Sequence, residues 1–537
     1  MPTSFFSAIR PCLFGLAFVH MWIYCSTHRF LESAGVSVTV VLYSAMSAAL
    51  ILLGILMWRR REALNLRQSS LTPNPVAPSA DARMASASAS ASPSSWPVRL
   101  PHPATVDGVA SVLMAVGGVA LSVPLPAVPP AMAAGVGAAL GGVGVVWAYG
   151  RWVQVYARLD LHVAAPLIFL TMVLGSSCKT VIDFLPPLPA AVVFACLPFA
   201  LFACARRSLA TVPAAPAANT YYNRRTIGSL GRVVCGVAAF SFTMGIIQAV
   251  FLESRPDPYV ASVLVNHGTE ILVALAFFWW VAVRHGGLDF GRTWRVILIL
   301  MITALVFESF FAGTPVHAVL FALMRTAHAL LVVYFLFLAI SDVARHGSYE
   351  PLAVYAVGWL AYTLPFTLGN VAGGAMAGTA FEPFVTSVAV WALVVTALIL
   401  LDDRSLGNQL IFAELNGENE EDVDALARRA VAAQQALEEQ HEHACARAAG
   451  TSAASGTSGT RAPANDLRPR CQTLARKHGL TSREAEVLEL LVRGHSKTRI
   501  AETFLISENT VRGHVKHIYA KLGVHSKQEL LDAFEGR

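Results

Sequence analysis

Long apolar runs recur through the first three quarters of this chain and limit its fold more than any other feature. A run of about 20 apolar residues is long enough to cross a bilayer as a helix. Twelve such runs lie near 6–25, 35–58, 106–126, 129–149, 161–182, 187–205, 232–252, 259–283, 294–312, 316–340, 352–375 and 384–401. Only 14% of the 537 residues are charged, whereas soluble globular domains carry about 25%. The sequence therefore predicts a multi-pass membrane domain over residues 1–401.

The positions of the basic residues predict how these runs are oriented. Lys and Arg concentrate in the cytoplasmic loops of membrane proteins. With the N-terminus inside, seventeen arginines fall in or beside the inner loops, at 59–99, 151–158, 206–232, 284–295 and 345. The outer loops and their edges contain only Arg29, Lys179 and Arg255. We expect both termini on the cytoplasmic side of a bacterial cell membrane, and the first run to be a retained span because no small-residue cleavage site follows it.

Two interruptions divide the membrane part. Residues 62–105 contain SASASASPSS, a low-complexity composition that predicts a loop without regular structure. Residues 208–230 separate six runs from six. This layout is similar to that of major facilitator transporters in the number of spans. The loop after the second run reads GILMWRRREALNLRQ and has no Asp, and no Gly after its arginines, so it does not match their usual loop motif.

The composition changes after residue 401. Residues 402–448 are predicted to form an acidic cytoplasmic helix, because 402–450 contain eleven acidic and four basic residues. Its apolar positions at 3-4-3-4 spacing fit either a short coiled-coil seam or a helix packed on a neighbouring domain. They are Val423, Leu426, Ala430, Ala433 and Leu437. His441, His443 and Cys445 would face different directions on a helix, so no metal site is expected. Residues 449–465 have the composition of a flexible linker.

Residues 470–537 have the pattern of a small four-helix domain. Thr481 and Glu484 form a capping box that predicts the start of the first helix. Three more helices are predicted, after caps at Ser496, Ser507 and Ser526. Their inward residues are Val487, Leu488 and Leu491; Ile500, Ala501 and Phe504; Val511, Val515, Ile518 and Leu522; and Leu530, Leu531 and Phe534. A tight turn at Leu505 before the third helix is typical of a helix-turn-helix DNA-binding domain.

The opposite face of the third helix is predicted to read DNA. Asn, Arg and Lys are side chains that reach base edges in the major groove, and Gly permits a close backbone approach. The predicted base-reading residues are Asn509, Arg512, Gly513 and Lys516. Residues that suit phosphate contacts flank them: Thr481, Ser496, Lys497, Thr510 and Lys521. The alternative is an ordinary solvated basic face, although residues 470–537 carry twelve basic and eight acidic residues together with several helix caps.

The stretch LTSREAEVLELLVRGHSKTRIAETFLISENTVRGHVKHIYAKLGVHSKQELL resembles the LuxR-type helix-turn-helix domain along its whole length. The resemblance implies a dimer on promoter DNA, with the third helix in the major groove and the fourth at the dimer contact. We expect this contact to involve either the seam at Leu426 and Leu437 or Leu530 of the fourth helix. RNA polymerase is a further expected partner. Arg499 stands where the family usually has an acidic residue, and Gly513 replaces a larger one. The whole layout is similar to LuxR-type regulators that carry a multi-pass membrane sensor.

Ionisable residues inside the predicted spans suggest what the membrane part does. Such groups are costly at mid-membrane depth and are usually functional or paired. The candidate sensor residues are Gln248, Asn266, His267, Glu270, Glu308, Arg325 and His328. We expect Glu270 and Arg325 to pair across two spans, and a ligand to compete for Arg325. The pair either locks two helices or belongs to a ligand pocket in the second half of the bundle.

The sequence thus predicts an all-α protein with a polytopic helical bundle and a small helix-turn-helix domain. The expected function is a membrane-anchored, one-component transcription regulator that responds to a small molecule. Its expected partners are double-stranded promoter DNA, the lipid bilayer, an unidentified effector and a second copy of the chain. The alternative is a protein of the secondary transporter type with a regulatory DNA-binding tail. No phosphate loop, paired nucleophile or metal cluster is apparent, so neither enzymatic activity nor a cofactor is expected.

Overall fold

The computed structural model covers most of the membrane part and a smaller share of the C-terminal region. The described residues are 10–29, 37–71, 102–124, 128–213, 222, 226–252, 260–284, 286–311, 314–347, 349–380, 382–396, 410–416, 471, 474, 478, 480–492, 500, 508–522, 524 and 529–530. The chain divides into two compact units, Met1–Glu439 and Gln440–Arg537. The predicted acidic helix, apart from 410–416, and the predicted linker lie outside the described residues.

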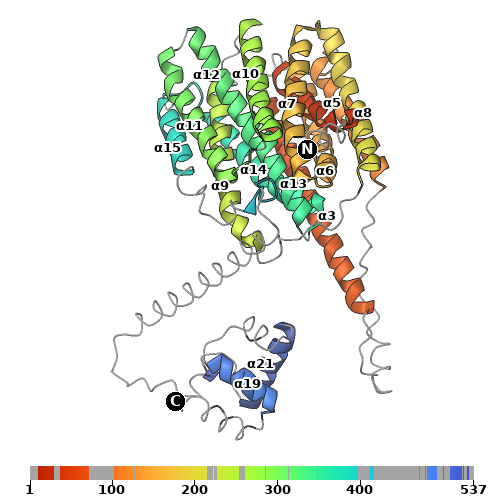
Figure 1. Cartoon of the computed structure of the whole chain (residues 1–537), viewed down its shortest axis with the longest axis vertical. Helices are drawn as coiled ribbons and strands as arrows, with labels where there is room; N and C mark the ends of the chain where they lie inside the picture. Colours follow the sequence, from red (N-terminus) through yellow and green to blue (C-terminus); the bar gives the residue numbers. More distant parts are fainter. Residues whose placement is uncertain are drawn as a thin grey trace. The chain divides into compact units, whose positions relative to one another are not determined.

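The first unit is a bundle of long helices (Figure 1). Its helices are α2 (Leu16–Tyr24), α3 (Val38–Leu71), α5 (Pro103–Ser122), α6 (Pro130–Tyr156), α7 (Leu161–Phe184), α8 (Pro187–Thr211), α9 (Gly231–Ile247), α10 (Val260–Phe278), α11 (Phe290–Glu308), α12 (Pro315–His328), α13 (Phe337–His346), α14 (Pro351–Met376) and α15 (Glu382–Val395). Short 3-10 or π segments extend several of them: η1 (Pro11–Gly15), η2 (Cys25–Arg29), η3 (Thr226–Leu230), η4 (Gln248–Leu252), η5 (Trp279–Val283), η6 (Ser309–Phe311) and η7 (Ala329–Leu336). The chain is therefore all-α, as predicted, and no strand is found in the described ranges.

Nine helices within the described ranges are long and apolar enough to cross a membrane. They correspond to nine of the twelve predicted runs, so the prediction of a multi-pass membrane domain is confirmed. The first run corresponds to a shorter apolar helix, Pro11–Thr27. The tenth run is divided among α12, η7 and α13, and the last corresponds to α15, after which residues 397–409 are not described. The count of twelve spans remains a prediction.

The structure differs from the sequence analysis at the start of the predicted 62–105 loop. Helix α3 continues to Leu71, ten residues beyond the expected end of regular structure. The sequence RRREALNLRQ explains the difference, since Arg, Glu, Ala, Leu and Gln are all good helix formers. Polar composition ended the apolar run at Trp58, but it did not end the helix. Residues 72–101 lie outside the described part of the chain.

Glycines permit close contact between helices in both halves of the bundle. A Cβ added at Gly369 of α14 would collide with the carbonyl oxygen of Phe242 in α9, and one at Gly245 would collide with Phe366. A Cβ added at Gly117 of α5 would likewise collide with the carbonyl oxygen of Gly137 in α6, and one at Gly137 would collide with that of Gly117. Small residues let helix backbones approach closely, which favours association where no hydrophobic driving force acts between helices.

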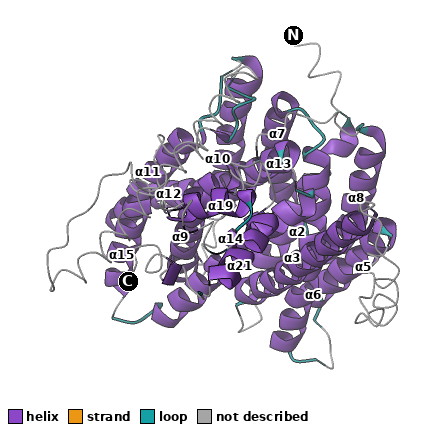
Figure 2. Ribbon diagram, turned by 90° about the horizontal axis from the view of Figure 1, so that it is seen from below, coloured by secondary structure: helices purple, strands orange, loops and turns teal. Residues whose placement is uncertain are grey.

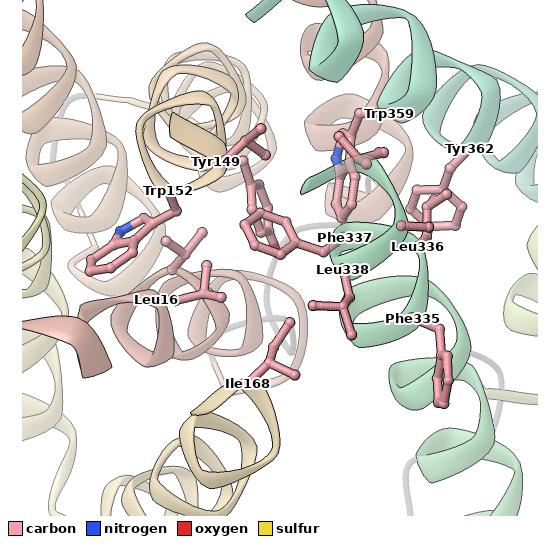
Figure 3. Packing of buried hydrophobic residues seen from close by; sticks show 14 of the residues in the cluster. Leu16, Tyr149, Trp152, Ile168, Phe335, Leu336, Phe337, Leu338, Trp359 and Tyr362 are labelled. Carbon is pink, nitrogen blue, oxygen red and sulfur yellow. The ribbon is translucent and has the colours of Figure 1, made fainter. Parts of the chain in front are cut away.

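The two halves of the first unit meet around a shared core. Figure 2 shows α5, α6 and α8 on one side of the bundle and α11, α12 and α15 on the other, with α14 near the centre. In Figure 3, Tyr149 of α6, Phe337 of α13 and Trp359 of α14 converge. The ring centroids of Tyr149 and Trp359 are 4.7 Å apart. Aromatic packing therefore joins helices of the first half to helices of the second.

The second unit contains helices α19 (Ser482–Val492) and α21 (Glu508–Leu522), which pack together. Its core consists of Val487, Leu488, Leu491, Ile500, Val511, Val515, Ile518, Val524 and Leu530. Each of these residues except Val524 was predicted to face inward, so the amphipathic pattern placed both helices correctly. Ala501, Phe504, Leu531 and Phe534 lie outside the described residues.

Candidate functional site

A cavity of about 150 Å³ lies inside the first unit. It is lined by His20, Ile23, Tyr24, Thr27, Thr39, Tyr43, Met46, Tyr149, Lys179, Gln248, Asn266, His267, Glu270, Arg325, His328, Ala329, Trp359, Tyr362 and Phe366. The first nine belong to the first six predicted spans, and the others belong to the last six. The expectation of a pocket confined to the second half is therefore wrong. Both halves build the cavity, because α2, α3, α6 and α7 pack against the later helices.

Glu270 of α10 pairs with Lys179 of α7. Its carboxylate lies 3.2 Å from the Lys179 Nζ and accepts a hydrogen bond of 2.6 Å from the Ser176 Oγ. Both charged side chains are buried, with exposures of 8% and 10%. The partner that the structure shows for Glu270 is Lys179, whereas the sequence analysis expected Arg325. The sequence analysis assigned Lys179 to an outer loop edge, whereas α7 continues to Phe184 and carries Lys179 into the bundle.

His267 connects this ion pair to a second carboxylate. Its Nδ1 lies 3.6 Å from the Glu270 Oε2, and its Nε2 lies 3.1 Å from the Asp183 Oδ2. The Tyr24 hydroxyl donates a 2.6 Å hydrogen bond to the same Asp183 oxygen. Asp183 and Lys179 are one helical turn apart on α7, so they present both charges to α10. The result is a buried polar network between α2, α7 and α10.

The structure brings most of the predicted sensor residues together. Six of the seven line the cavity: Gln248, Asn266, His267, Glu270, Arg325 and His328. The His328 Nε2 lies 3.2 Å from the Tyr362 hydroxyl, and its ring stacks on Phe366. The remaining residue, Glu308, ends α11, and its side chain is not described. Polar residues inside apolar runs thus indicated residues that line a common cavity.

Sequence reasoning missed three members of the network: Tyr24, Lys179 and Asp183. Lys179 and Asp183 lie close to the end of the fifth apolar run, where a charge is ordinarily solvated. Their i, i+4 spacing was visible in the sequence and could have indicated a shared face. Tyr24 carries no such signal, because an aromatic residue near a span end usually marks the membrane interface.

The lining combines charged groups with aromatic surface. Lys179 and Arg325 are the basic side chains, Glu270 is the acidic one, and three histidines add groups that can donate or accept hydrogen bonds. Tyr43 and Phe366 have ring centroids 4.7 Å apart. With the histidines neutral, the lining carries a formal charge of +1.

The second unit shows how its first helix begins. The Glu484 Oε2 accepts a 2.8 Å hydrogen bond from the Thr481 backbone N–H, and the Glu484 N–H lies 3.3 Å from the Thr481 Oγ1. This is the predicted capping box. Lys521 of α21 also places its Nζ 2.6 Å from the same carboxylate oxygen. Hydrogen bonding from Lys521 and from the Thr481 backbone lowers the pKa of Glu484 to about 2. Glu484 therefore joins the start of α19 to the end of α21.

The buried residues of α21 define which face is available for DNA. Val511, Val515 and Ile518 point into the core, so positions 509, 512, 513 and 516 lie on the opposite side of the helix. Asn509, Arg512, Gly513 and Lys516 thus share one face, although their side chains are not described, nor is that of Thr510. Ser496 and Lys497 are outside the described residues. Thr481 and Lys521 both contact the Glu484 carboxylate.

One expectation about dimerisation is corrected by this core. Leu530 was expected to belong to the dimer contact of the fourth helix. Its side chain is fully buried against Val511 and the other residues of its own domain, so it is not available to a second copy. The other expected contacts, Leu426 and Leu437, lie outside the described residues.

Comparison with known proteins agrees with this geometry. Residues 478–534 match the family described as "Bacterial regulatory proteins, luxR family". The C-terminal unit carries a LuxR-type helix-turn-helix domain. Over 53 residues this domain is 47% identical to the Fimbriae Z protein of Escherichia coli (strain K12) and 43% identical to the Oxygen regulatory protein NreC of Staphylococcus aureus (strain JH9).

The likeness covers only part of each protein. The matched residues are 10% of this chain and 25% and 24% of the two relatives. The LuxR-type domain implies DNA binding and a role in transcription regulation, and the long apolar helices fit a multi-pass membrane domain.

Proposed function

We propose that this chain is a membrane-anchored, one-component transcription regulator whose bundle binds a small molecule and thereby controls DNA binding. The observation that carries the proposal is the presence, on one polypeptide, of a LuxR-type domain and a bundle with a charged internal cavity. Charged groups inside a membrane domain are costly and usually serve a function. A bundle that served only as an anchor would not need Lys179, Glu270 and Arg325 around a cavity.

The lining supports an aromatic ligand with a carboxylate. The guanidinium of Arg325 offers a planar set of donors that matches a carboxylate, and the rings of Tyr43, Trp359 and Phe366 offer flat apolar surface. An engineered apolar protein cavity of about 150 Å³ holds benzene, so benzoate is close to the upper size. In this proposal the ligand carboxylate binds Arg325, with His267 and His328 as hydrogen-bond partners.

We further propose that the LuxR-type domain binds promoter DNA as a dimer, with α21 in the major groove and RNA polymerase as a further partner. A single small domain buries too little surface for specific affinity, and paired half-sites suit this fold. Arg512→Ala should cost about 1–3 kcal/mol of discrimination between promoter and random DNA. Lys521→Ala should instead weaken binding to both DNAs equally. Unchanged discrimination in Arg512→Ala would exclude this face of α21 as the reader.

DNA binding also requires the C-terminal unit to be cytoplasmic. The basic loops support a bacterial cell membrane location with both termini inside. A topology reporter in the 208–230 loop should give a cytoplasmic signal, and one at Arg255 should give an outer signal. An outer signal for the 208–230 loop would overturn the twelve-span layout.

A second candidate function is supported by the position of the cavity. Secondary transporters place their substrate sites between two halves of the bundle, and residues of both halves line this cavity. The chain would then move its ligand across the membrane and regulate transcription through its tail. Uptake of labelled benzoate into vesicles that contain the protein distinguishes the two functions. Saturable uptake that is lost in Arg325→Ala supports transport, and binding without uptake supports a sensor.

A further inference from the structure

A second buried polar cluster lies away from the cavity, where α13 ends. It consists of Asp342 and His346 of α13 and Glu414 of the segment 410–416, which we call the exit segment because the chain continues from it toward the LuxR-type domain. Asp342 is completely buried, and His346 retains 5% of its exposure. Three possible ligand atoms of these residues lie within 4.8 Å of one another.

The exit segment is packed tightly onto this cluster. Leu410, Phe412 and Ala413 are completely buried. Phe412 has a φ of 66°, a conformation that non-glycine residues rarely adopt and that surrounding contacts must stabilise. Its backbone N–H donates a 3.2 Å hydrogen bond to the Asp342 Oδ2. The Tyr222 hydroxyl lies 3.0 Å from the same oxygen and 2.9 Å from the carbonyl oxygen of Leu410, and it can donate to either.

His346 lies between the two carboxylates. Its Nδ1 is 3.4 Å from the Asp342 Oδ1, and its Nε2 is 3.0 Å from the Glu414 Oε2. A neutral imidazole has one N–H and one lone pair. With both carboxylates ionised, one ring nitrogen would therefore place its lone pair against an anionic oxygen. One additional proton, on the ring or on Glu414, turns this repulsion into attraction.

The surroundings favour Glu414 over His346 as the carrier of this proton. Burial and the Asp160 carboxylate raise the pKa of Glu414, whereas burial lowers the pKa of His346 to about 4. Opposing groups also face Glu414. The Arg345 Nε lies 3.5 Å from its Oε2, and the Leu161 N–H and His162 favour its ionised form. Groups of both signs therefore act on the Glu414 carboxyl, and those that raise its pKa prevail.

We propose that Asp342, His346 and Glu414 form a proton-binding cluster that closes the exit segment onto α13 and releases it when the proton is lost. The closed form binds one proton more than the open form. The pKa of the cluster is therefore higher in the closed form, so closure is favoured at low pH and is lost as pH rises. A divalent metal is disfavoured, because His346 turns different nitrogens to the two carboxylates and Arg345 brings a positive charge beside Glu414.

The cluster and the cavity lie on one continuous run of helix. Arg325 and His328 of α12 line the cavity, η7 follows with π-helical geometry, and α13 ends with Asp342 and His346. From Arg325 to Asp342 are 17 residues, or about 25 Å at a rise of about 1.5 Å per residue. Segments of π-helix often mark functional sites. A change at Arg325 can thus reach the exit segment, and this consequence, unlike the cluster itself, rests on the proposed function.

Hydrogen exchange of the full-length protein in lipid nanodiscs tests the cluster without ligand or DNA. Amide protection in peptides that cover 410–416 is measured from pH 6 to 8.5 and corrected for the intrinsic exchange rate. Protection in the wild type should fall as pH rises, by up to about tenfold per pH unit for one proton. In Glu414→Gln the amide can donate to the His346 Nε2 without a titratable proton, so protection should persist and lose its pH dependence.

Two further variants complete the test. Asp342→Ala should remove protection at every pH, because the Phe412 N–H loses its acceptor and the Tyr222 hydroxyl loses one of its two. Glu350→Gln is the matched control, because Glu350 lies four residues after His346 and forms an exposed ion pair with Arg60. The protection of 410–416 in this variant should follow that of the wild type. Protection that is independent of pH in the wild type, or that still titrates in Glu414→Gln, would overturn the proposal. Loss of protection on adding EDTA would assign the cluster to a metal instead.

Discussion

Two buried ion pairs cross the first unit, and they differ in what surrounds them. Asp107 of α5 and Arg151 of α6 are 3.1 Å apart, with side-chain exposures of 0% and 10%. Glu270 and Lys179 are 3.2 Å apart and equally buried. The first pair is enclosed by its own partners, since Trp147 donates to Asp107 and Arg151 donates to Gln154. The second lines the cavity and joins helices from the two halves.

Burial and distance therefore do not separate an enclosed ion pair from one that lines a cavity. Asp107 and Arg151 connect two helices that are adjacent in sequence and already held together by Gly117 and Gly137. Glu270 and Lys179 are 91 residues apart, and they share the cavity with Arg325 and His267. The informative difference is the open space beside the second pair, where a ligand could replace one partner of the pair.

The largest expected effect concerns the enclosed pair. Asp107→Ala leaves Arg151 buried without its carboxylate, and breaking a buried pair in this way costs about 3–5 kcal/mol. The thermal unfolding temperature of the purified protein in nanodiscs should fall strongly, or folded protein should not accumulate. The matched control is the double variant Asp107→Leu with Arg151→Met, which removes both charges and should recover most of the stability. If Asp107→Ala unfolded at the wild-type temperature, the pair would not stabilise the bundle.

A smaller effect on stability is expected at the cavity pair. Glu270→Gln still accepts a hydrogen bond from Ser176 and leaves Lys179 beside polar groups and open space. The expected cost is about 1–3 kcal/mol, below that of Asp107→Ala. Its main effect should be on binding, measured as the shift in unfolding temperature that benzoate causes. Equal stability losses at the two sites would contradict the distinction between an enclosed pair and a cavity pair.

Exchanging the charges of Glu270 and Lys179 tests the same comparison. Glu270→Lys combined with Lys179→Glu should restore most of the stability lost in either single variant, because the two opposite charges still face each other. It should not restore binding, since the negative charge moves to α7 and the arrangement around Arg325 changes. Restored benzoate binding in the exchanged variant would make the pair structural only, and the ligand site would have to lie elsewhere.

The smallest effect is expected for the more exposed pair of the second unit. Glu484 keeps 5% of its side-chain exposure, but Lys521 keeps 35%, so solvent weakens their attraction. Because the pKa of Glu484 is lowered to about 2, its contribution is present above the ordinary carboxyl pKa of about 4.3. It is lost as pH falls from there toward 2. Amide exchange in α19 should therefore differ between wild type and Glu484→Gln at pH 6, and the difference should shrink in acid. A difference that did not change with pH would show that the carboxylate charge is unimportant.

The sequence predicted elements better than partners. Apolar runs of span length and the capping box at Thr481 and Glu484 are local signals, and the structure has nine apolar helices of span length among its described residues and the predicted cap. Lys179 was not foreseen as a partner of Glu270, because the pairing of two spans depends on how helices pack. Asp342 and His346 are visible as an i, i+4 pair, but Glu414 follows about 70 residues later, and no local pattern links it to them. The end of α3 was misplaced because hydropathy marks the edge of a membrane and not the end of a helix.

In the proposed function, the state of the cavity controls DNA binding by the LuxR-type domain. The most direct test is the DNA occupancy of the full-length protein in cells, compared between wild type, Arg325→Ala and Arg512→Ala across growth conditions with and without small aromatic carboxylates. Wild-type occupancy should change in at least one condition. Arg325→Ala should occupy the same sites without that change, and Arg512→Ala should lose site selection. If Arg325→Ala followed the wild type in every condition where the wild type changes, the cavity would not be the sensor.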